Sequence, residues 1–267
     1  DPDTCNLDPA KIESAITPQT TAILPVHVYG NPCDVDAIER IAENYNLKVI
    51  YDAAHAFGCK YRGESLCSFG DLSIISFHAT KVFNTFEGGA IICQDAKTKA
   101  HIDHLKNFGF VDETTVVAAG INGKMRVFST ALDLLQLQYI DKYICKRQQI
   151  AQTYSTELAH VKGIDCINFP PEHQSNYSYF PILVKPDFNL SRDELYDLLK
   201  KNGINGRRYF YPLISDFPMY RGLPSANKYN LLSAQEISEQ VICLPIYADL
   251  ELASVRYIVK LIRDISI

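Results

Sequence analysis

A carboxylate, an imidazole and an amine stand in short polar segments that each follow an apolar stretch. Asp52 and His55 lie in the segment YDAAHAFG, and Lys81 ends the segment SFHATK, which begins at Ser76. Asp52 and Lys81 are 29 residues apart, about one strand–helix–strand crossover, so both should project from the same edge of a sheet. A pyridoxal phosphate site needs this pair, because the lysine forms a Schiff base and the acid partners the pyridinium nitrogen.

Each of these residues, taken alone, also has an ordinary structural explanation. An aspartate at a strand end is often a turn or cap residue, and a lysine after a strand usually faces solvent. His55 follows Asp52 by three residues, so a helical turn would let both face one side, where the imidazole could reach a cofactor oxygen. Ser76 could donate a hydrogen bond to a phosphate, although a serine in a strand is structural about as often. The hypothesis of a pyridoxal phosphate site therefore rests on the occurrence of these residues together.

The first half of the chain alternates between patterns for strands and for a helix. Apolar runs at 21–29, 47–51, 72–77 and 89–93 are expected to be strands, and 34–43 is expected to be a helix with acidic residues at its start. Strands without clear polar alternation, separated by amphipathic helices, indicate an α/β fold with a mainly parallel sheet. Ligands bind such sheets at the carboxyl ends of the strands, where the polar segments lie.

The second half is expected to form a smaller α+β domain. A long helical stretch from about Ser129 to Leu158 should leave the sheet, followed by a strand at 179–184 and a helix ending at Lys201. Ser191 and Glu194 form a capping-box pattern at the start of that last helix. A loop rich in Tyr and Pro and two more helical patterns follow. We therefore predict one domain over residues 1–140 and a second over 141–267.

Composition excludes several classes of protein. The chain has 267 residues, of which 47% are hydrophobic and 21% charged, as in globular proteins. Its net charge of −5 provides no overall attraction to nucleic acid, and no apolar run is long enough to cross a membrane. Its eight cysteines form no Cys-x-x-Cys pair or disulfide framework, which favours a soluble protein of the cytoplasm. No G-x-G-x-x-G follows a predicted strand, which disfavours a dinucleotide-dependent dehydrogenase.

Several ordered motifs together resemble one protein family over essentially the whole chain. They are ILPVHVYGNPCDVDAI, YDAAHAFG, SFGDLSIISFHATKVFNTFEGGAI and GINGKMRVFSTALDLLQL. The chain resembles the fold type I, pyridoxal-phosphate-dependent sugar aminotransferases of the DegT/DnrJ/StrS family. The resemblance implies that Lys81 is the Schiff-base lysine, that Asp52 partners the pyridinium nitrogen, that His55 lies beside the phenolic oxygen and that Ser76 contacts the phosphate.

The resemblance also implies a partner subunit and a longer family architecture. Asn122 matches an asparagine that reaches the phosphate of the neighbouring subunit's cofactor, which implies a homodimer with shared active sites. In family members a further portion precedes the position of Asp1 and supplies a phosphate-binding loop and an aromatic residue that stacks on the ring. A chain lacking that portion would have an incomplete pocket. A non-catalytic homologue that keeps the fold and dimerises is therefore an alternative hypothesis.

The expected reaction is transamination of a nucleotide sugar. Related dehydratases have histidine in place of the lysine, whereas this chain has Lys81. The donor implied by the resemblance is an amino acid, usually glutamate. HATKVFNTFEGG and GRRYFYPLI look most like enzymes that aminate dTDP-4-keto-6-deoxyglucose for surface polysaccharide or related glycans, with 3-keto sugars as the alternative. Arg207, Arg208 and Tyr209 are candidate contacts to the sugar or its diphosphate, although either arginine could equally be part of a solvated turn.

Overall fold

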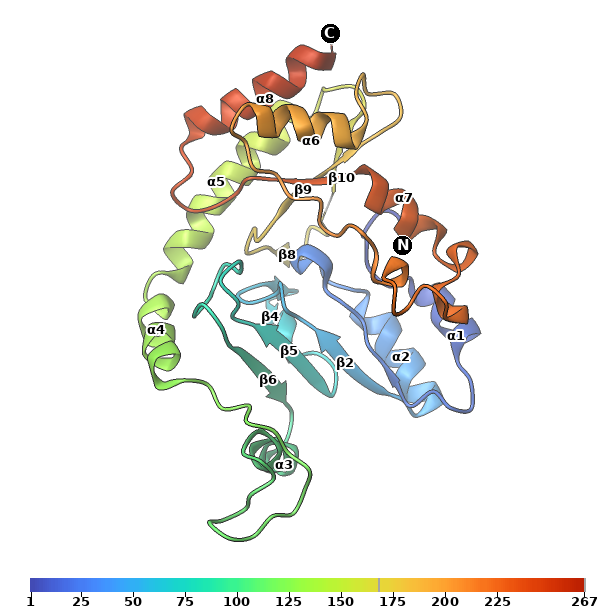
Figure 1. Ribbon diagram of the computed structural model, residues 1–267, viewed down its shortest axis with the longest axis vertical. Helices are drawn as coiled ribbons and strands as arrows, with labels where there is room; N and C mark the ends of the chain where they lie inside the picture. Colours follow the sequence, from blue (N-terminus) through green and yellow to red (C-terminus); the bar gives the residue numbers. More distant parts are fainter. Residues whose placement is uncertain (168, 267) are drawn as a thin grey trace. The chain divides into compact units, whose positions relative to one another are not determined.

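The computed structural model describes residues 1–167 and 169–266, which divide into two compact units (Figure 1). The Lys81 unit comprises Leu7–Asp141 and Glu172–Ser175, and the C-terminal unit comprises Asp1–Asn6, Lys142–Pro171 and Asn176–Ile267. Each unit contains its own sheet and buried core. The sequence-based domain boundary at residues 140 and 141 stays a prediction about independent folding, because each unit also takes in a short segment from elsewhere in the chain.

A four-stranded sheet organises the Lys81 unit. Its strand order is β1 (Ala22–Ile23), β2 (Lys48–Asp52), β5 (Leu72–Ser76), β6 (Gly89–Cys93). The first two pairings are parallel and the last is antiparallel, so the sheet is mainly parallel, as expected. Other elements of the unit include α1 (Ile12–Ala15), α2 (Val35–Tyr45), α3 (Ala96–Lys106), α4 (Val127–Leu137) and a small sheet of β4 (Glu64–Ser65), β3 (Lys60–Tyr61) and β8 (His173–Gln174).

Helix α2 covers the sheet with one apolar face. Asp34 caps the helix by accepting a hydrogen bond from the Ala37 N–H at 3.0 Å. Val35, Ile38 and Ala42 follow helical spacing and pack in one core with residues of β1 and β2. This packing fixes the strand that ends at Asp52.

The first strand is shorter than its apolar run predicts. Residues 21–29 were expected to form one strand, but β1 covers only Ala22–Ile23. Pro25 has no N–H to give to a ladder, and the chain then turns through Tyr29 and Gly30, which both have positive φ. An isolated parallel bridge between Val26 and Asp52 continues the pairing into this turn.

The C-terminal unit has an antiparallel sheet under three helices. The strand order is β10 (Val241–Leu244), β9 (Phe180–Val184), β7 (Ile164–Cys166). Figure 1 shows α5 (Ile140–Leu158), α6 (Arg192–Lys201) and α8 (Leu252–Ser266) beside this sheet, and α7 (Leu232–Gln240) precedes β10. Alternate residues of β9 share one buried core with those three helices. The expected strand at 179–184 and the expected helix ending at Lys201 are both present.

The predicted helix from Ser129 to Leu158 is two helices. α4 ends at Leu137 and α5 begins at Ile140. Between them the N–H groups of Gln138 and Tyr139 bond to carbonyls three residues back, a tighter turn than the α-helix makes. Neither Pro nor Gly marks this interruption, so residue types alone do not reveal it.

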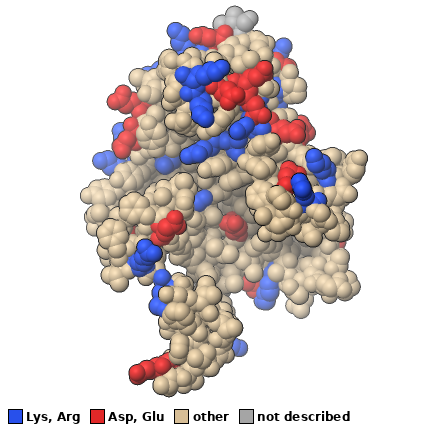
Figure 2. All heavy atoms as spheres, viewed as in Figure 1, with Lys and Arg blue, Asp and Glu red and all other residues tan. Residues whose placement is uncertain are grey.

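Figure 2 shows basic and acidic side chains intermixed on the face that it draws. None of the described helices combines the length and apolar composition needed to cross a membrane.

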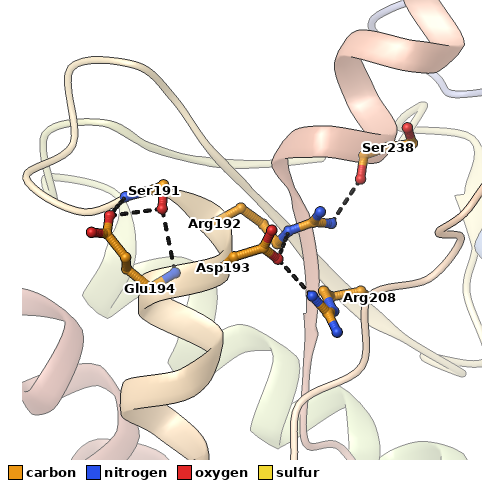
Figure 3. Close-up of polar contacts among 6 residues, drawn as sticks. All are labelled: Ser191, Arg192, Asp193, Glu194, Arg208 and Ser238. Carbon is orange, nitrogen blue, oxygen red and sulfur yellow. Dashed lines mark hydrogen bonds and ion pairs between the residues drawn. The ribbon is translucent and has the colours of Figure 1, made fainter.

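The capping box of α6 gives a test of the fold. The Ser191 hydroxyl accepts the Glu194 N–H at 3.3 Å, and the Glu194 carboxylate accepts the Ser191 N–H at 2.8 Å (Figure 3). We expect Ser191→Ala to lower the free energy of unfolding by about 1 kcal/mol, since a helix N–H loses its acceptor. Urea denaturation measures this change. Asp197→Ala, at an exposed position of the same helix, should stay within about 0.5 kcal/mol, and equal losses in both variants would contradict the assignment.

Candidate active site

The parallel pairing of β2 with β5 brings two predicted site residues to one edge of the sheet. Ile50 lies opposite Leu72 and Asp52 opposite Ile74, so the two strands run in the same direction and end close together. Asp52 is the last residue of β2, and Ser76 is the last residue of β5. The Asp52 carboxylate oxygen Oδ1 accepts the Ala54 N–H at 3.0 Å, which stabilises the turn leaving the strand.

Lys81 lies in the loop between β5 and β6, and backbone hydrogen bonds close this loop. The Phe77 N–H donates to the Gly88 carbonyl at 2.9 Å, and the Thr85 N–H donates to the Phe77 carbonyl at 3.0 Å. At the tip, the Lys81 N–H donates to the His78 carbonyl at 2.9 Å. The lysine is therefore carried on an ordered turn anchored at both strand ends.

The glycines of the segment FEGGAI let β6 approach β5 closely. Gly89 lies opposite Ser76 in the antiparallel register. A Cβ at Gly89 would lie 2.7 Å from the Ile75 carbonyl oxygen, well inside van der Waals contact. This position therefore requires glycine, and the pairing that it permits closes the Lys81 loop.

An aromatic stack joins the Asp52 turn to the Lys81 loop. The rings of Phe57 and Phe83 are nearly parallel with centroids 4.1 Å apart, and Phe77 meets Phe83 edge to face at 5.0 Å. Phe57 follows His55 by two residues, and Phe83 follows Lys81 by two. The sequence analysis missed these two phenylalanines, although apolar residues inside otherwise polar segments were a usable signal.

His55 is a buried imidazole at the Asp52 turn. Its Nδ1 accepts the Tyr29 N–H at 3.2 Å. Burial lowers the pKa of His55 to about 3, and the positive charge of Lys81 lowers it further in the same direction. His55 is therefore uncharged at neutral pH.

The structure brings Lys81 within electrostatic reach of both Asp52 and His55. Partial burial lowers the pKa of Lys81, because desolvation disfavours the ammonium form, and the Asp52 carboxylate opposes this by attracting the ammonium. A lysine with a lowered pKa has a larger neutral fraction, which is the form that can act as a nucleophile or base. The described residues contain no cluster of three His, Cys, Asp or Glu side chains that could hold a metal.

Ser76 and Asn122 lie in the same unit but make different contacts. The Ser76 hydroxyl accepts the His78 N–H at 3.3 Å at the base of the Lys81 loop. Asn122 is exposed and forms an isolated bridge with Asn107, in the segment after α3. It lines a groove together with Phe86, Ile91 and other residues, and Lys81 is outside the lining of that groove. Their roles as phosphate contacts stay predictions.

Arg207, Arg208 and Tyr209 belong to the C-terminal unit, and the two arginines differ in their contacts. The guanidinium of Arg208 forms an ion pair with Asp193 at 2.7 Å (Figure 3). It also lies over the Tyr196 ring, 4.4 Å from the ring centroid. Arg207 is exposed, and its backbone N–H donates to the Cys243 carbonyl at 3.0 Å.

Asp193 holds a second, buried guanidinium as well. Arg192 lies 2.7 Å from the same Asp193 oxygen, and it also donates to the Ser238 carbonyl at 2.7 Å (Figure 3). Tyr209 stacks on Phe210 with centroids 5.0 Å apart. The Arg208 side chain thus ties its loop to α6, a structural contact that the motif alone did not indicate.

Comparison with known proteins assigns the whole arrangement to one family. The sequence profile of the DegT/DnrJ/EryC1/StrS aminotransferase family matches residues 1–263. The chain is 51% identical to a dTDP-4-amino-4,6-dideoxy-D-glucose transaminase of Shigella dysenteriae, over 96% of this chain and 69% of that protein. It is 52% identical to a protein of the same name from Escherichia coli, over 96% of this chain and 70% of that protein.

A solved structure shows the same fold. The crystal structure of DesI in the presence of its TDP-sugar product superposes with a TM-score of 0.93 and 33% sequence identity. The superposition covers 100% of this chain and 67% of DesI.

Burial and the Asp52 carboxylate shift the pKa of Lys81 in opposite directions, which gives a prediction. In the cofactor-free chain, Asp52→Asn should lower the pKa of Lys81, because the ammonium loses a nearby negative charge. The pH dependence of Lys81 acetylation, quantified by mass spectrometry, measures this pKa. Asp71→Asn is the control: Asp71 pairs with Lys48 at 2.6 Å, so its loss should affect Lys48 and leave Lys81 unchanged. An unchanged or raised Lys81 pKa in Asp52→Asn would refute the coupling.

Proposed function

Because the chain belongs to the DegT/DnrJ/EryC1/StrS aminotransferase family, we propose that it transfers an amino group from an amino acid, glutamate first among the candidates, to dTDP-4-keto-6-deoxy-D-glucose. The observation that carries the proposal is the coupled cluster of Asp52, His55 and Lys81 at the carboxyl edge of a mainly parallel sheet. The names of the relatives at 51% and 52% identity support the 4-keto sugar over its 3-keto isomer.

The residues of the cluster fit pyridoxal phosphate, the cofactor of this family. Lys81 would hold it covalently through Nζ. Asp52 would pair with the ring nitrogen through Oδ2, which accepts no hydrogen bond from any described residue, whereas its Oδ1 is occupied by the Ala54 N–H. Ser76 would offer its hydroxyl to the phosphate. The sheet edge thus supplies an anion for the nitrogen and a hydroxyl and an amine for the remaining groups.

Lys81 is the residue that moves protons in the proposed reaction. Pyridoxal phosphate, when bound, supplies an electron sink that acidifies the Cα–H of an amino acid. Once the incoming amino acid has displaced Lys81 from the cofactor, its freed Nζ would accept that proton as a neutral amine, a form that its lowered pKa favours. It would later give a proton to the carbon of the sugar that receives nitrogen.

The contacts in the C-terminal unit sharpen the choice of substrate-binding residues. Arg208 already contacts Asp193 and the Tyr196 ring, so its guanidinium anchors its own loop to α6. Arg207 is exposed and has no ion pair with a described residue, and we propose that it is the better candidate for the diphosphate. Tyr209 presents an aromatic ring beside it.

We also propose that the protein is a homodimer that shares its active sites. Support comes from α4, whose apolar residues Val127, Phe128 and Leu134 are 87%, 72% and 65% exposed. The segment after α3, which carries Asn122, adds further exposed apolar side chains, among them Ile121. Such a surface is typical of an interface with another subunit. The eight free thiols support a reducing compartment, and we place the protein in the cytoplasm.

The catalytic assignment is tested by the reaction of the chain with glutamate and each of the two dTDP-keto sugars, read by product mass. We expect the 4-amino product, visible absorbance of the bound cofactor, and loss of both in Lys81→Ala, because no other residue supplies the covalent link. Lys48→Ala, an exposed lysine of the same unit paired with Asp71, should keep both. Product from the 3-keto sugar alone would move the proposal to that substrate, and absence of cofactor binding would favour a non-catalytic homologue.

The dimer is tested by size measurement over a range of protein concentrations. Leu134→Glu should raise the dimer dissociation constant by at least about tenfold, since it places a charge in an apolar interface. Leu232→Glu is a matched control, because Leu232 is also 65% exposed and lies at the start of α7. A monomeric wild-type chain, or equal effects of the two variants, would contradict this interface.

A further inference from the structure

The turn that follows β1 lies directly against the Asp52 turn. The Asp52 N–H donates to the Pro25 carbonyl at 2.9 Å, and the His27 N–H donates to the Asp52 carbonyl at 3.0 Å. These two bonds hold the chain from Pro25 onward beside the strand end that carries the candidate site. Tyr29, two residues beyond His27, is therefore placed next to His55.

Tyr29 has an unusual backbone conformation for an aromatic residue. Its φ of 58° and ψ of 13° lie in the left-handed region, which side chains with a Cβ rarely adopt. The residue is 2% exposed, so surrounding packing holds it there. In this conformation its N–H donates to His55 Nδ1 at 3.2 Å instead of to a backbone carbonyl of a regular element. Strained residues of this kind concentrate at functional sites.

We propose that Tyr29 is a positioning residue whose backbone N–H fixes His55 as the tautomer protonated on Nε2, so that His55 serves the bound cofactor as a hydrogen-bond donor and not as a base. The role of the cofactor in this statement rests on the proposed function. The tautomer itself is a property of the chain alone.

The chemistry of imidazole carries the inference. A ring nitrogen that accepts a hydrogen bond must present its lone pair, so the proton of a neutral imidazole is on the other nitrogen. The opposite tautomer would place an N–H of the ring against the N–H of Tyr29. A doubly protonated ring would do the same, and burial and the charge of Lys81 already disfavour it.

The fixed tautomer gives Asp52, His55 and Lys81 different roles in hydrogen bonding and proton transfer. An ionised Asp52 carboxylate has no proton to donate, so it acts only as a hydrogen-bond acceptor, whereas His55 offers an N–H. Lys81 is then the residue whose protonation changes during the reaction. A donor at His55 suits an anionic oxygen of the cofactor, and a ring nitrogen that already carries a proton cannot accept one from Lys81.

The experiment uses nitrogen NMR of the chain with ¹⁵N-labelled histidine, with and without pyridoxal phosphate. We expect His55 to show a neutral ring protonated on Nε2 in both states. The tyrosine α-hydroxy acid analogue at position 29 replaces the N–H with an ester oxygen and keeps the side chain. This replacement should shift the His55 tautomer population toward Nδ1 protonation by roughly fivefold to tenfold, the change expected for loss of one buried hydrogen bond.

Two controls separate positioning from general damage. The same analogue at Tyr45 removes an N–H from the last turn of α2 and should leave the His55 spectrum unchanged. Tyr29→Phe keeps the backbone N–H and should also leave the His55 spectrum unchanged.

In the protein loaded with pyridoxal phosphate, His55→Gln retains an N–H donor and should preserve the visible absorbance maximum of the cofactor, whereas His55→Met should shift it.

The outcomes distinguish this inference from the proposed function. A native His55 protonated on Nδ1, or a tautomer that does not respond to the ester at position 29, overturns the positioning role. An Nε2-protonated His55 that responds to the ester, in a chain that binds no cofactor and makes no amino sugar, upholds the positioning role and refutes the proposed function.

Discussion

The parallel pairing of β2 with β5 is the constraint on which the rest of the site depends. Because both strands point the same way, their last residues, Asp52 and Ser76, meet at one edge of the sheet. The antiparallel return of β6 then closes the loop that carries Lys81. The stack of Phe57 on Phe83 joins the turn after β2 to the loop after β5. A slip of one residue in the β2–β5 register would turn Asp52 to the other face of the sheet and separate it from Lys81.

Desolvation lowers the pKa of two members of the cluster, His55 and Lys81. Burial lowers the pKa of Lys81 and also keeps His55 neutral, and the charge of Lys81 further disfavours the cationic form of His55. Asp52 compensates for only one of them, since its carboxylate acts on Lys81. One carboxylate, one neutral imidazole and one amine of lowered pKa are thus consequences of packing as much as of residue type. A cofactor that needs an acid, a donor and a reactive amine finds all three in one place.

Two adjacent arginines of one sequence motif make different contacts in the C-terminal unit. Arg207 and Arg208 are neighbours in sequence and equal as candidates by residue type. Asp193 and the Tyr196 ring hold Arg208 in an ion pair and a ring contact, and the buried Arg192 shares the same carboxylate. One aspartate therefore organises the start of α6 and the loop that carries Tyr209. Arg207 keeps an exposed side chain.

The sequence by itself determined the α/β class, the family, and the candidate residues Asp52, His55, Ser76 and Lys81, because strand runs, helix caps and ordered motifs are local patterns. The capping box at Ser191 was visible for the same reason. The end of the first strand also had a local sign, because Pro25 has no N–H for a ladder. Only the tertiary structure decided that α4 and α5 are separate helices and that Arg208 is occupied by Asp193. It also decided that the N–H of Tyr29 meets His55. These features depend on contacts between residues distant in sequence, or on backbone angles that residue type does not dictate, and so no local pattern could report them.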